Sequence, residues 1–189
     1  MEIEKVKELL LQSLEVERGG VKIYEAALNV VRNEHLKEEW ERFLDQTGHH
    51  VEVLERVLVA LGMDPSEQTP GTSIAGELGD ALLQAIENAM EGNDLDAAQL
   101  VAAECILLAE TRDHLDWELI KEVVQSFGGA ERAALEDACA EIEDQEDEHV
   151  QHARSWAREL WLKSLGVKAP IRRQGKLATG TRAELHRRH

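Results

Sequence analysis

The sequence has few of the residues on which several classes of protein depend. Its 189 residues include only two cysteines, Cys105 and Cys139. These do not form a C-x-x-C pair, which excludes a disulfide scaffold, a thiolate zinc site and an iron–sulfur site. Basic residues are scarce, because 21 Lys and Arg stand against 38 Asp and Glu and give a net charge of −17. Such an acidic surface repels nucleic acid and anionic membranes, so we expect neither as a partner.

Long apolar runs are also missing. None approaches the ~18 residues that a membrane span requires. The opening segment MEIEKVKELL mixes charged and aliphatic side chains, which is unlike a signal peptide. Hydrophobic residues nevertheless make up 43% of the chain, enough for a packed core. We therefore expect a cytoplasmic protein of about one domain.

Proline is rare and its three positions divide the chain. Pro65 and Pro70 lie close together, and Pro170 lies near the end. The two long proline-free segments between them are rich in Ala, Leu, Glu, Lys, Arg and Gln, which are strong helix formers. No segment shows the alternating pattern of a strand or the turn of a hairpin. The sequence therefore predicts an all-α fold.

The expected helices form two hairpins joined by a long crossover. Four long helices are expected over residues 3–32, 34–62, 94–127 and 131–165, and a shorter one over residues 73–90. Gly76 and Gly79 would weaken this shorter helix. The pattern is that of an antiparallel four-helix bundle with one long connection. We assign residues 1–166 to the bundle and residues 167–189 to a basic, flexible tail.

Acidic and imidazole side chains interrupt the apolar stripes of the long helices. Residues three and four apart share a helix face, so these side chains would point into the core. They are Glu17, His50, Glu110, Glu146 and His149. Burying one unpaired carboxylate costs several kcal/mol. Several such groups at one level need a shared partner, and a metal ion is one.

The levels can be compared by counting residues from the hairpin tips. Glu17 and His50 lie sixteen and seventeen residues from residue 33, or ~25 Å along their helices. Glu110 lies at a similar distance from the second tip, whereas Glu104 would lie about 9 Å too far along the axis. We therefore prefer Glu110 as the ligand from the third long helix, with Glu104 or Asp113 as alternatives.

The resulting donor set suits iron, manganese or zinc, and its hard oxygens favour a pair of ions. Ferritin-like di-iron bundles carry Glu-x-x-His on two helices and one Glu on each of the other two. Here Glu146 and His149 form one such motif. The second motif is expected around His50, but Gln46 and Thr47 occupy the place of its carboxylate. The segment around His50 nevertheless resembles a repeat of the segment around His149. Whether the site holds two ions, one or none is left open.

Two segments carry a family resemblance. The first is the segment over residues 44–55, LDQTGHHVEVLE, together with the Ala-Leu-Gly at residues 60–62. The second consists of Glu110, Asp113 and Trp117. They resemble the ferritin-like superfamily, above all the small bacterial stress bundles of the YciF and YciE type. The rubrerythrin bundle is a more distant relative. The resemblance covers residues 3–165, and no rubredoxin-like cysteine module accompanies it.

The resemblance implies a di-iron or di-manganese carboxylate protein that oxidises Fe(II) or reduces peroxide in stress defence. Glu110 or Glu146 would bridge two ions and Glu17 would bind one of them. His50 and His149 would each supply an imidazole, and an open position would admit O₂ or peroxide. We also expect a homo-oligomer, such as a dimer.

A second hypothesis remains open. The chain could be a degenerate bundle without metal that acts as a structural or partner-binding module. Gln46 and Thr47 favour this alternative, whereas the intact motif of Glu146 and His149 favours the metal protein.

Overall fold

The computed structural model describes residues 3–167, and these are helical except at the turns. The helices are α1 (Ile3–Leu28), α2 (Glu34–Ala60), α3 (Pro70–Glu91), α4 (Leu95–Val124) and α5 (Gly129–Ser164). The described residues contain no strand, which confirms the all-α prediction. None of these helices combines the length and apolar character needed to cross a bilayer. The expected basic tail lies almost entirely outside the described residues.

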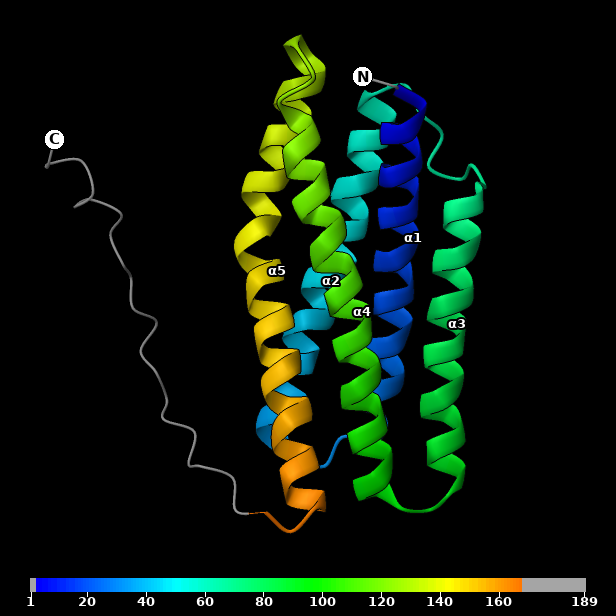
Figure 1. The fold of residues 1–189 in the computed structure, drawn as a ribbon, viewed down its shortest axis with the longest axis vertical. Coiled ribbons are helices and arrows are strands. Elements are labelled where there is room, and N and C mark those ends of the chain that lie inside the picture. The colour runs from blue at the N-terminus through cyan, green and yellow to red at the C-terminus, as the bar shows by residue number, and fades with distance from the viewer. Residues whose placement is uncertain (1–2, 168–189) are drawn as a thin grey trace, which may run out of the picture.

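Helices α1, α2, α4 and α5 form the expected bundle (Figure 1). α1 packs against α2 and α4, and α5 packs against α4 and α2. α3 covers the outside of the bundle and contacts α1 and α4. The expected short helix over residues 73–90 is longer than predicted, since it has 22 residues. The first helix is shorter than predicted, because it ends at Leu28 rather than near residue 32.

Local signals fix where the helices begin. The side chains of Asn33, Thr69 and Asp94 accept hydrogen bonds from the first backbone N–H groups of α2, α3 and α4. Pro70 occupies the first turn of α3, where a missing N–H costs nothing. Gly62 follows α2 with a φ of 73°, a conformation that glycine adopts without strain. These caps set the register in which polar side chains enter the core.

Two apolar clusters fill the bundle, one toward each end. The first includes Tyr24, Trp40, Phe43, Ile106 and Trp156. The second includes Leu10, Leu54, Trp117, Ile120 and Ile142. On each of the four bundle helices, the predicted polar side chains fall between the residues of the two clusters. A polar layer therefore lies across an otherwise apolar core.

Two glycines bring α1 and α3 together. A Cβ atom placed on Gly79 would lie 3.4 Å from the Cα atom of Gly19. Gly79 therefore lies where the backbones of α3 and α1 approach each other closely, and it is more than a weak point of the helix as its low propensity suggested. Because neither glycine has a side chain, α3 can pack closely against α1.

This contact predicts how stability responds to side-chain size at residue 79. We expect Gly79→Leu to lower the free energy of unfolding of the metal-free protein by about 1–3 kcal/mol, because the side chain would push α3 away from α1. Gly48→Leu is the matched control, since a Cβ atom there meets nothing within 4 Å. Chemical denaturation measures both. Equal stability of the two variants would contradict the close packing of α1 and α3.

Candidate metal centre

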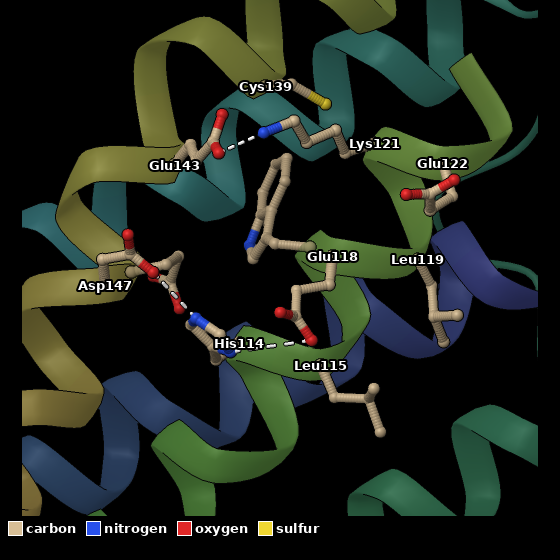
Figure 2. A pocket seen from close by; sticks show the side chains of 11 residues that line it. His114, Leu115, Glu118, Leu119, Lys121, Glu122, Cys139, Glu143 and Asp147 are labelled. Atoms are coloured by element: carbon tan, nitrogen blue, oxygen red, sulfur yellow. Dashed lines mark hydrogen bonds and ion pairs between the residues drawn. The ribbon is translucent and has the colours of Figure 1, made fainter. Parts of the chain in front are cut away.

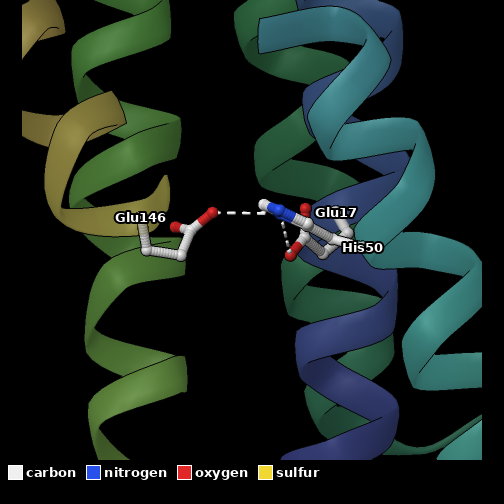
Figure 3. A group of neighbouring side chains, drawn as sticks. All are labelled: Glu17, His50 and Glu146. Atoms are coloured by element: carbon white, nitrogen blue, oxygen red, sulfur yellow. Dashed lines mark ion pairs between the residues drawn. The ribbon is translucent and has the colours of Figure 1, made fainter. Parts of the chain in front are cut away.

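The structure brings the five predicted site residues together in the polar layer. Their side chains are buried, with 0–3% of each residue exposed: Glu17, His50, Glu110, Glu146 and His149. Figure 3 shows that Glu146 from α5 points across the bundle toward Glu17 on α1 and His50 on α2. Their role as metal ligands stays a prediction, but their convergence at one level does not depend on it.

The ligand atoms form two groups that share one carboxylate. Glu17, His50 and Glu146 make the first group, and Glu110, Glu146 and His149 make the second, with the atoms of each group within 4.8 Å of one another. His50 Nδ1 lies 3.0 Å from Glu146 Oε1 and 3.3 Å from Glu17 Oε1. His149 Nδ1 lies 3.4 Å from both Glu146 Oε1 and Glu110 Oε2. The Glu146 carboxylate is therefore common to both groups.

Most of the facing atoms lack a hydrogen-bond partner. Seven buried atoms of this layer have none, because the short ion-pair distances do not have hydrogen-bond geometry: Glu17 Oε2, His50 Nδ1, Glu110 Oε2, Asp113 Oδ1, both carboxylate oxygens of Glu146, and His149 Nδ1. Buried polar atoms are nearly always paired in folded proteins. Carboxylate oxygens and imidazole nitrogens are donors that iron, manganese and zinc accept. The residues present therefore fit a metal centre.

The remaining carboxylate oxygens of the two outer glutamates are held by aromatic donors. Trp117 Nε1 donates to Glu17 Oε1 at 2.8 Å, and the Tyr24 hydroxyl donates to Glu110 Oε1 at 2.7 Å. Burial, together with Glu110, raises the pKa of Tyr24, which keeps its proton available for this bond. Each glutamate is thus oriented through one oxygen and presents the other to the centre.

Two glutamines orient the imidazoles in a reciprocal way. His50 Nε2 lies 3.1 Å from Gln145 Oε1, and His149 Nε2 lies 3.0 Å from Gln46 Oε1. An amide oxygen only accepts, so each Nε2 carries a proton and each Nδ1 faces the carboxylates. The sequence prediction missed this role and treated Gln46 only as part of a gap. The signal was the glutamine that comes four residues before each histidine.

The structure also decides between the candidates on α4. Glu104 does not reach the centre, because its Oε1 accepts a hydrogen bond from Trp161 Nε1 at the surface, at 2.7 Å. Glu110 is the residue at the centre, as preferred. Thr47 is buried on the α2 side, so the carboxylate of that motif is indeed absent. Asp113 is buried as well, one turn after Glu110.

A comparison with known families assigns the chain. The model of a family described as "Ubiquinone biosynthesis protein COQ7" matches residues 11–181, a range that includes all five predicted ligands. The chain belongs to the COQ7 family. Searches among curated proteins and solved structures found no significant match.

COQ7 proteins are ferritin-like di-iron carboxylate proteins, so the predicted superfamily and its metal chemistry are confirmed at that level. The family match does not show the narrower resemblance to YciF and YciE bundles. The family's description refers to ubiquinone biosynthesis rather than to a stress response.

A pocket connects the surface to this COQ7 centre. It has a volume of about 430 Å³, lies between α4 and α5, and includes Glu146 and Trp117 in its lining. Figure 2 shows ion pairs crossing it from α4 to α5. His114 Nε2 lies 2.9 Å from Asp147 Oδ1, and Lys121 pairs with Glu143. The pocket gives small molecules a path to the side of Glu146.

The charges of the metal-free centre are set by burial and by neighbours. Burial alone would lower the pKa of His50 and raise that of Glu146. Because Glu146 and Glu17 flank His50, its pKa rises to about 10, and that of His149 rises to about 9 beside Glu110 and Glu146. The two imidazoles lower the pKa of Glu146 to about 2. Without metal, the histidines are therefore cations among carboxylates.

This predicts a pH dependence of the metal-free protein. The pKa values of both histidines are higher in the folded state than the unfolded value of 6.5. Their contribution to the free energy of unfolding is fully present below pH 6.5. It declines as the pH rises toward 9–10, by roughly 1.4 kcal/mol per pH unit for each imidazole. Denaturation at several pH values measures it, and His149→Gln should reduce the slope. A stability that is constant between pH 7 and pH 10 would contradict the assignment.

Proposed function

We propose that this chain is a di-iron hydroxylase that acts on the ring of a quinone precursor in ubiquinone biosynthesis. The observation that carries the proposal is the set of unpartnered oxygen and nitrogen atoms at the centre of a COQ7-family bundle. Iron is the metal that the family implies. Manganese and zinc accept the same donors and remain alternatives.

Each residue of the centre has a role in this proposal. Glu17 and His50 would hold one ion, Glu110 and His149 the other, and Glu146 both. If iron is bound there, it would supply the activation of O₂ for a reaction in which one oxygen atom is inserted into a ring C–H bond and the other is reduced to water by two electrons and two protons from an external reductant. The apolar clusters on both sides of the layer keep bulk water away.

The pocket between α4 and α5 supports a small organic substrate. Its volume lies within the roughly 300–1,000 Å³ range of ligand sites. Its lining combines the apolar faces of Trp117, Leu115 and Leu119 with hydrogen-bonding side chains. Such a mixture fits a substituted aromatic ring that carries oxygen atoms. Because Glu146 also lines the pocket, a ring bound there would lie beside the proposed ions.

The alternatives that the sequence left open are less well supported. A bundle without metal leaves seven buried polar atoms of this layer without a hydrogen-bond partner, and buried groups of this kind are costly in a core. Peroxide reduction in stress defence was inferred from the resemblance to YciF and YciE, and no geometric feature of the site favours it over hydroxylation.

Turnover of a quinol analogue tests the proposal. The iron-loaded chain, given a short-chain methoxy-benzoquinol, O₂ and a reductant, is expected to form a product that is 16 Da heavier, or 18 Da heavier in ¹⁸O₂. Glu146→Ala should lower this rate by more than about 100-fold, because even outer partners of metal ligands cost 10–100-fold. Glu136→Ala is the control, since Glu136 is an exposed acid on the same helix.

Mass spectrometry of the product decides the outcome. A heavier product from the wild type, lost in Glu146→Ala and kept in Glu136→Ala, supports the hydroxylase. Consumption of peroxide by the iron-loaded chain without any hydroxylated product would contradict it and would favour the stress-defence alternative.

A further inference from the structure

One carboxylate is missing from the expected ligand set. Ferritin-like di-iron bundles use four carboxylates and two histidines. The positions predicted from the sequence supply three, Glu17, Glu110 and Glu146, because Thr47 replaces the carboxylate of α2. Three carboxylates leave two divalent ions with one uncompensated positive charge in a buried layer. Such a charge is costly in an apolar core.

Asp113 lies where it could supply the fourth carboxylate. It follows Glu110 by three residues on α4 and therefore shares its face of the helix. Only 5% of the residue is exposed, and its Oδ1 atom is buried without a hydrogen-bond partner. The carboxylates of Glu17, Glu146 and Glu110 are all close enough to act on its charge, and the Glu17 carboxylate also lies within hydrogen-bonding reach of it. Its side chain is thus aimed into the polar layer.

A second buried aspartate on α4, Asp116, differs from Asp113 because a basic side chain of the protein neutralises its charge. Asp116 is 0% exposed and its two oxygens also lack hydrogen-bond geometry, but its Oδ1 lies in an ion pair 2.7 Å from an Arg112 nitrogen. Among residues 3–167, Asp113 has no Lys or Arg in an ion pair with it. Its surroundings hold three carboxylates instead. Its buried Oδ1 atom has no hydrogen-bond partner among the described residues, and a bound cation would supply one.

We propose that Asp113 is a metal ligand that replaces the missing carboxylate of α2, at the ion held by Glu17 and His50. The proposal rests on the di-metal centre proposed above. With Asp113, four carboxylates balance two divalent ions and the buried layer is neutral overall. The fourth carboxylate of the centre has then moved from α2 to α4.

Metal stoichiometry tests this role without any measurement of activity. The full chain, freed of metal, is titrated with Co(II) under anaerobic conditions, and bound metal is counted by visible absorption and by elemental analysis after dialysis. We expect two ions in the wild type. In Asp113→Asn the first ion should remain, and the affinity for the second should fall by more than about tenfold. Asp116→Asn is the matched control and should keep two.

A rescue variant distinguishes a ligand from a general effect on the core. Adding Thr47→Glu to Asp113→Asn returns a carboxylate to α2 and should restore two bound ions. The melting temperature of the metal-free protein separates a structural role. Metal-free Asp113→Asn should melt no lower than the wild type, because Asn has the size of Asp and is not repelled by the three carboxylates around it.

The outcomes separate this inference from the proposed function. A wild type that binds two ions, with Asp113→Asn also binding two at unchanged affinity, overturns the role of Asp113 and leaves the di-metal centre intact. A wild type that binds fewer than two ions overturns both. A metal-free Asp113→Asn that melts below the wild type would show that Asp113 stabilises the fold and would overturn its assignment as a ligand.

Discussion

The structure depends on one electrostatic constraint, which is the burial of acidic side chains with too few cations of the chain's own. Glu17, Glu110, Asp113 and Glu146 face two histidines in a layer closed off by apolar clusters. In water these groups would cost little, but in a core each unpaired charge costs several kcal/mol. The COQ7 fold accepts this cost because a pair of bound cations would remove it.

The surrounding structure holds the layer in place. Trp117 and Tyr24 each fix one oxygen of an outer glutamate, and Gln46 and Gln145 each fix one imidazole from the facing helix. These bonds leave the unpartnered atoms facing the same small volume. A site whose ligands are already oriented loses little conformational entropy when it binds an ion, which favours affinity and a defined geometry.

Much of this could be predicted from the sequence, because helix periodicity places residues on faces and the rise per residue places them at levels. Glu110 was preferred over Glu104 on that basis, and the structure agrees. The glutamine bonds could not be derived, since they join side chains of different helices whose rotation is set by packing. The packing of α3 against α1 could not be derived either, because it depends on the close approach that Gly79 allows and not on its helix propensity. The family match does not show the narrower resemblance to YciF and YciE bundles, and the sequence could not decide this point because ferritin-like bundles share ligand patterns across different activities.

The central claim is that this layer binds two metal ions, and anomalous diffraction tests it most directly. Crystals of the full chain grown anaerobically with Fe(II) should show two anomalous peaks about 3.5–4 Å apart, as in other two-metal sites, with the Glu146 carboxylate between them. An anomalous map with no peak in the polar layer, or with iron only at surface carboxylates, would contradict the account.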